Sequence, residues 1–219
     1  MARSKHGMTT AQASAKKRKG HKREANFNKV YGCSDATINW SGASPDCEIR
    51  LDHPIIQILN TKLGISGNSV SVKGGNTIQF HLGRLPELTD ESRMKVRKVK
   101  KTIVEHGISF TDQKAVLKGN AFWNKYLRKG DILVYDYDNG KRIFFNMDDV
   151  IEFICTRCTW RILETGRLKG DFVSGGSTRQ FLTYEYRSKK RLFVMGAQGG
   201  KCGKRFIELL QSQLRHHIQ

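Results

Sequence analysis

The sequence contains no long apolar run, few prolines and few cysteines. No stretch approaches the roughly 20 consecutive apolar residues of a membrane-spanning helix, and the first residues lack the apolar segment of a secretory signal. The cysteines are odd in number and scattered, at positions 33, 47, 155, 158 and 202, which does not resemble a disulfide framework. These absences argue against a membrane protein and against a disulfide-stabilised secreted domain. We therefore expect a globular cytoplasmic protein.

Acidic residues are scarce beside basic ones. Lys and Arg number 39 against 20 Asp and Glu, which gives the 219-residue chain a formal charge of +19 and a pI of about 10.0. A compact domain tolerates this self-repulsion best when its partner is a polyanion. Nucleic acid is the leading partner, because the sequence lacks the basic helix with a large apolar face that binds anionic membranes. Charge alone does not separate a DNA-binding protein from a structural RNA-binding protein.

The N-terminal third begins with a polar segment and continues with a helical pattern. Residues 1–18 are small, polar and basic, and we interpret them as a flexible arm that either lies along phosphates or merely solubilises the chain. Phe27, Val30 and Tyr31 then recur at helical spacing before Gly32, with Glu24 on the same stripe. An acid on an inward helical face is costly unless it is paired or binds a cation.

Turn signals predict two β-hairpins and a mixed fold. The first hairpin joins 68–73 to 77–82 across Gly74-Gly75-Asn76, and the second joins 131–137 to 142–146 around Asn139-Gly140. Further helices are predicted at 55–63, from residue 86 or 87 to 105, at 148–156 and at 205–217, and further strands at 36–40, 47–51, 160–164, 171–173, 180–186 and 191–195. The expected fold class is α/β, with a mixed central β-sheet flanked by helices and a β-rich C-terminal lobe after residue 110.

Four polar positions form an ordered set in the first 90 residues. Asp46 follows Pro45 in a turn before a strand, and alternation places Ser71 and Lys73 on one face of the next strand. Glu87 follows fourteen residues after Lys73, at the predicted start of a charged helix. We expect these positions to converge. Three of the four also have a simpler interpretation: Asp46 as a turn residue, Lys73 as a solvated strand residue, and Glu87 as an acid favoured in a first helical turn.

The order of these residues resembles that of the PD-(D/E)xK nucleases. A helix carrying Glu24 is followed by Pro45-Asp46 and then by a strand of the small-x-Lys type. The family usually has an acid two residues before the lysine, where this chain has Ser71. One branch of type II restriction endonucleases carries Ser-x-Lys and places the displaced glutamate on a later helix, where Glu87 lies. Lys19-Gly20 and Glu24 are also similar to the N-terminal helix of related nucleases, including archaeal junction resolvases.

The resemblance implies a restriction-endonuclease-like fold and Mg²⁺-dependent cleavage of double-stranded DNA at a short specific site. Asp46 and Glu87 would then bind Mg²⁺, which prefers one or two carboxylates together with phosphate oxygens and waters. Lys73 would position or activate the attacking water, and Ser71 would hydrogen-bond a metal-bound water. Glu24 would support the site or serve a second ion.

The same interpretation divides the chain into a basic flexible arm (1–18), a nuclease core (19–109) and a β-rich continuation with DNA-recognition elements (110–219). A homodimer suits a palindromic site, and a cognate DNA methyltransferase would be a partner in the same host. Alternatives are a structure-selective or repair endonuclease, resembling a junction resolvase, and a non-catalytic DNA- or RNA-binding protein.

The candidate DNA-binding residues are basic and lie in clusters: Arg97, Lys98, Lys101, Arg179, Arg187, Lys189, Lys190, Arg191, Lys201 and Lys204.

Overall fold

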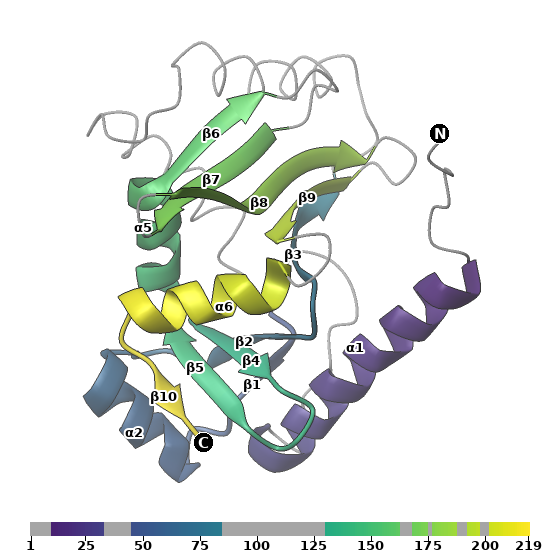
Figure 1. Ribbon diagram of the computed structural model, residues 1–219. Coiled ribbons are helices and arrows are strands. Elements are labelled where there is room, and N and C mark those ends of the chain that lie inside the picture. The colour runs from purple at the N-terminus through teal and green to yellow at the C-terminus, as the bar shows by residue number, and fades with distance from the viewer. Residues whose placement is uncertain are drawn as a thin grey trace.

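The computed structural model describes residues 10–32, 45–84, 130–162, 168–174, 177–187, 192–197 and 202–219, and these form an α/β fold. Two five-stranded β-sheets are combined with four helices in these ranges (Figure 1). The helices are α1 (Thr10–Tyr31), α2 (Pro54–Leu63), α5 (Met147–Arg157) and α6 (Cys202–Gln213).

The first sheet is mixed and has the strand order β1-β2-β4-β5-β10. Its strands are β1 (Cys47–Glu48), β2 (Ser69–Gly74), β4 (Ile132–Asp136), β5 (Arg142–Asn146) and β10 (His217–Ile218). β2 and β4 run parallel, and the other neighbours are antiparallel. The predicted hairpin around Asn139-Gly140 is confirmed, with positive φ at Asp138 (67°) and Gly140 (89°). The predicted mixed sheet flanked by helices is therefore present.

The second sheet is antiparallel throughout and has the order β3-β9-β8-β7-β6. Its strands are β3 (Ile78–Arg84), β6 (Cys158–Ile162), β7 (Leu168–Ser174), β8 (Ser177–Arg187) and β9 (Leu192–Ala197). The predicted hairpin across Gly74-Gly75-Asn76 is wrong. Both strands exist, but β2 already has β1 and β4 as neighbours, so the chain turns at Gly75 (φ 81°) and β3 pairs with β9 in the other sheet.

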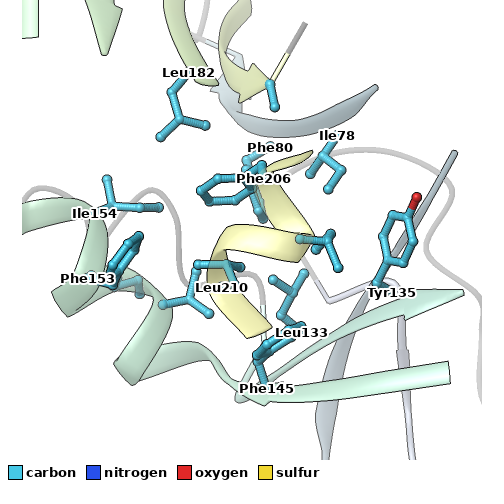
Figure 2. Close-up of a cluster of buried hydrophobic side chains, with 14 of the residues drawn as sticks. Ile78, Phe80, Leu133, Tyr135, Phe145, Phe153, Ile154, Leu182, Phe206 and Leu210 are labelled. Carbon is cyan, nitrogen blue, oxygen red and sulfur yellow. The ribbon is translucent and has the colours of Figure 1, made fainter. Parts of the chain in front are cut away.

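Alternating residues of the first sheet serve two hydrophobic cores. Ile132, Val134 and Phe144 face α1 and α2 in one core. Leu133 and Phe145 belong to the other core, together with residues of α5, α6 and the second sheet. α6 lies between the two sheets (Figure 1), and its Phe206 and Leu210 are surrounded by side chains from both (Figure 2): Ile78, Phe80, Leu133, Phe145 and Leu182. Burial on both sides of α6 holds the sheets together.

Three local predictions need correction. α1 begins at Thr10, so residues 10–18 of the proposed flexible arm are helical; Ala, Gln, Lys and Arg are good helix formers even without an apolar face. Val30 is 49% exposed, so the buried stripe of α1 consists of Phe27 and Tyr31 alone among the three residues proposed. The last helix ends at Gln213, and His217 pairs instead with Phe144 in the first sheet.

The two sheets do not divide the chain at residue 110. β4 and β5 follow that position, yet β4 pairs with β2, while β3 precedes it and belongs to the second sheet. The boundary itself, residues 1–9, the strand predicted at 36–40 and the helix predicted to begin at 86 or 87 lie outside the described residues. Within the described ranges, no helix has the length and apolar character needed to cross a membrane.

Candidate active site

Asp46 is fixed at the edge of the first sheet by the backbone of β2. Its N–H donates to the carbonyl of Val70 at 2.8 Å, just before β1 pairs with β2. The N–H of Val72 donates to Oδ2 of Asp46 at 2.8 Å, and the hydroxyl of Ser71 donates to the same oxygen at 3.3 Å. The carboxylate is therefore oriented by a strand twenty-five residues further along the chain.

Lys73 completes an ion pair with this carboxylate. Its Nζ lies 2.8 Å from Oδ2 of Asp46, and the two side chains are only 14% and 15% exposed. The stem of Lys73 passes near Phe80, with Nζ 6.0 Å from the ring centroid. Ser71 is fully buried on the same strand. The predicted convergence of Asp46, Ser71 and Lys73 is thus found in the structure.

Glu24 lies beside this pair, brought there by α1. Its Oε2 is buried and has no hydrogen-bond partner among the described residues. Burial raises the pKa of Glu24 to about 7, the neighbouring Asp46 carboxylate contributes to this rise, and the Lys73 ammonium opposes both. A carboxyl that is buried, close to a second acid and without a hydrogen bond on one oxygen is typical of a functional position.

The pair Arg23 and Asp138 holds α1 in this place. Nη2 of Arg23 donates to Oδ2 of Asp138 at 2.6 Å, and Nζ of Lys19 lies 2.9 Å from the same oxygen. These contacts, chiefly the hydrogen bond from Arg23, lower the pKa of Asp138 to about 2. Arg23 also lies over the turn after Lys73, where a Cβ at Gly74 would come within 2.6 Å of its Nε. The glycine therefore makes room for the arginine.

The sequence interpretation did not identify Arg23, Asp138 or the thiol beside the carboxylates. Cys47 is buried next to Asp46, and burial, followed by the charges of Asp46 and Glu24, raises its pKa to about 12. The signal for Asp138 was its place in the Asp138-Asn139-Gly140 turn, where positive φ is common. Nothing in the spacing indicated that this turn would meet α1, because 115 residues separate Asp138 from Arg23.

Most of the predicted peripheral residues cannot be compared with the structure. Glu87, Arg97, Lys98, Lys101, Lys189, Lys190, Arg191 and Lys201 lie outside the described residues, and at Arg179 and Arg187 the description covers the backbone of β8 alone. Lys204 is exposed on α6, 3.9 Å from Glu208. The DNA-binding assignments therefore stay predictions.

The described acids fit a hard divalent cation. In the described ranges no three His, Cys, Asp or Glu side chains gather as a metal cluster. The two acids that lie beside Lys73 there and could contribute to a site are Asp46 and Glu24. The described hydrogen bonds to the Asp46 side chain all go to Oδ2, and Oε2 of Glu24 has no described partner. Two carboxylates with unsatisfied oxygens match the preference of Mg²⁺ for few protein ligands.

Comparisons with protein-family models, with curated proteins and with solved structures found no match to this chain. The class of site defined by the geometry is a partly buried acid–lysine–acid cluster at the edge of a mixed sheet.

Proposed function

We propose that this protein is a Mg²⁺-dependent nuclease that hydrolyses phosphodiester bonds of double-stranded DNA at the Glu24–Asp46–Lys73 cluster. The observation that carries the proposal is the meeting of these three side chains from three separate segments. Asp46 is paired with Lys73 at 2.8 Å, and Glu24 has a buried oxygen without a described partner. An arrangement built only for stability would not leave a buried carboxyl oxygen without a hydrogen bond, because that is costly.

The chemical demand of phosphodiester hydrolysis agrees with these groups. The site must accept negative charge that develops on the phosphate and must orient an attacking water. Asp46 and Glu24 would hold Mg²⁺, together with Glu87 if its helix reaches the cluster. The bound ion would lower the pKa of a coordinated water and polarise the phosphate.

Lys73 has a separate task in the proposed site. Its ammonium is held by Asp46 and has a second contact to the carbonyl of Val72 at 3.2 Å, so its direction is fixed. A cation fixed in this way stabilises charge on a phosphate or orients the water without first losing its own freedom. Ser71, which donates to Asp46, keeps that carboxylate in the productive orientation.

DNA is the proposed substrate because of the charge of the chain. A formal charge of +19 attracts any polyanion, and a site built for phosphodiester hydrolysis selects a nucleic acid among them. The sequence resemblance favours cleavage of a duplex at a specific site by a homodimer. A structure-selective endonuclease and a non-catalytic binder are separate outcomes of the same experiment.

The test incubates the protein with phage DNA in EDTA or in excess Mg²⁺ (about 10 mM, in the range that saturates weak carboxylate sites). Discrete fragments in Mg²⁺ alone indicate a restriction endonuclease. Cutting confined to junction or damaged substrates indicates a structure-selective enzyme. A gel shift without cleavage in any condition contradicts the proposal.

The variants Asp46→Asn and Lys73→Met assign the activity to the cluster. Each is expected to slow cleavage by about 100-fold or more, the usual cost of removing one preorganised charged contact. The asparagine side chain can still accept the hydrogen bond from the Val72 amide through its carbonyl oxygen, so folding should be preserved. The matched controls are Asp52→Asn and Lys62→Met, which change exposed residues of the same types. Equal rates in all four variants would place the activity elsewhere.

A further inference from the structure

The face of α1 that packs into the core through Phe27 and Tyr31 continues toward the N-terminus, beyond the core. Tyr31 and Phe27 are buried, and the same stripe then passes through Glu24 to Gly20 and Lys17 at steps of three or four residues. In a helix that only packs against the protein, this stripe would stay apolar. Here the same face carries an acid at Glu24, no side chain at Gly20 and a cation at Lys17.

The N-terminal half of α1 is not packed against the described parts of the protein. Residues 11–19 are exposed, and Figure 1 shows this end of the helix leading away from both sheets. The chain has no acid between Thr10 and Arg23, but it has five exposed cations there: Lys16, Lys17, Arg18, Lys19 and Lys22. Of these, Lys19 alone has an acidic partner among the described residues, and this is Asp138.

Gly20 has no side chain, so this face of α1 has a gap one turn before Glu24. A Cβ added at Gly20 would have no heavy atom within 4 Å, so packing within the described residues does not require glycine there. Glycine in the interior of a helix disfavours the helix, and it is used where another backbone must approach closely.

We propose that the inner face of α1, defined by Lys16, Lys17 and Gly20, docks the phosphate backbone of double-stranded DNA and leads it to the cluster at Glu24. This inference deepens the proposed function and rests on it. Lys17 and Glu24 are seven residues apart, about 10 Å along a helix axis, which corresponds to about three base-pair steps of 3.4 Å. Among polyanions, duplex DNA presents charge in a rigid line that matches a straight helix.

The opposite side of the same helix supplies the control. Arg18 and Lys22 are four residues apart and lie on the side of α1 away from Gly20. The double variants Lys16→Gln/Lys17→Gln and Arg18→Gln/Lys22→Gln remove the same charge from the same helix. Gln and Lys have similar helix propensities, and circular dichroism with thermal melts would verify that both variants fold.

Binding is measured by fluorescence anisotropy of a short labelled duplex of mixed sequence, in EDTA, across a salt series. The inner-face variant is expected to lose affinity on the order of tenfold or more at about 0.1 M salt, and the slope of log K against log salt should become shallower by about 2. The outer-face variant should change affinity by less than about threefold (about 0.65 kcal/mol at 25 °C). Equal losses in both variants, or no loss in either, would overturn the inference.

Two further probes test the kind of polyanion. Single-stranded RNA and vesicles of phosphatidylserine replace the duplex under the same conditions. A larger inner-face effect on either probe than on duplex DNA would overturn the commitment to DNA. Because the measurement needs no cleavage, an inner-face effect without Mg²⁺-dependent cutting would reject the proposed nuclease alone, and cutting without an inner-face effect would reject the docking surface alone.

Discussion

Replacing Glu24 by glutamine should stabilise the metal-free protein at alkaline pH and have a much smaller effect, below about 1 kcal/mol, at pH 5. Glutamine copies the shape of the protonated carboxyl but never ionises. Glu24 has a pKa raised from 4.5 to about 7, mainly by burial and then by the charge of Asp46. The folded state therefore keeps a proton that the unfolded state has already lost, and stability falls as the pH rises from about 4.5 through about 7.

The magnitude follows from the same pKa values. A tenfold change in proton affinity corresponds to about 1.4 kcal/mol, so the rise from 4.5 to about 7 corresponds to at most about 3 kcal/mol. The access of water to this partly buried group reduces the value, and we expect about 2 kcal/mol at pH 8.5. At pH 5 the folded carboxyl still holds its proton but most unfolded chains have lost theirs, so the variant should exceed the wild type by less than about 1 kcal/mol.

The assay is urea unfolding of the wild type and Glu24→Gln in EDTA at pH 5 and pH 8.5. A repeat of the pH 8.5 series in Mg²⁺ links the stability to the proposed ion. Mg²⁺ should raise the free energy of unfolding of the wild type more than that of the variant, because in the proposed site the ion would bind the folded carboxylate pair. The reasoning is refuted if the difference between the two proteins does not depend on pH. An equal effect of Mg²⁺ on both would remove Glu24 from the proposed ion site.

Two further changes test how α1 is held and why it carries Gly20. Asp138→Asn removes the charge and keeps a residue type that tolerates the positive φ of this position. It should lower the free energy of unfolding by about 1 kcal/mol, a modest value because the carboxylate is partly exposed and screened. The wild type should itself lose this contribution as the pH falls below 3.8, because Asp138 protonates near its pKa of about 2. Chemical unfolding at pH 7 and pH 2 measures both, and an unchanged midpoint at pH 7 would contradict the clamp. Gly20→Ala should raise stability by about 0.5–1 kcal/mol, since alanine favours the helix and meets no neighbour. A thermal melt that shows destabilisation would contradict the open space at this position.

Local signals in the sequence predicted the elements that depend on local chemistry. The β4–β5 hairpin forms at the predicted Asn139-Gly140 turn, with the positive φ values at Asp138 and Gly140. α2 begins at Pro54 and ends before Gly64 in the left-handed region, as proline and glycine at these positions predict. The convergence of Asp46, Ser71 and Lys73 was also predicted, from strand alternation, from a turn before a strand and from the resemblance in their order.

Contacts between residues far apart in the chain could not be predicted from such local signals. The basic helical segment 10–18 has no apolar periodicity, so its helicity depends on intrinsic propensity and on the attachment of Lys19 and Arg23 to Asp138. The pairing of β3 with β9 joins residues more than a hundred positions apart. No feature near Gly74 indicated that pairing, since the energy of a sheet comes from the whole surface that its strands bury.

The failed hairpin prediction and the meeting of Asp46 with Lys73 have one cause. Had β2 and β3 formed a hairpin, β3 would have occupied an edge of β2 that now belongs either to β1 or to β4. Loss of β4 would remove a fully buried strand from the core. Loss of β1 would take away the pairing that brings Asp46 within 2.8 Å of both the Val72 amide and the Lys73 ammonium. The turn at Gly74-Gly75 therefore directs the chain into the second sheet. Because β3 leaves the first sheet, the edge of β2 is free to pair with β1, the strand that directly follows Asp46.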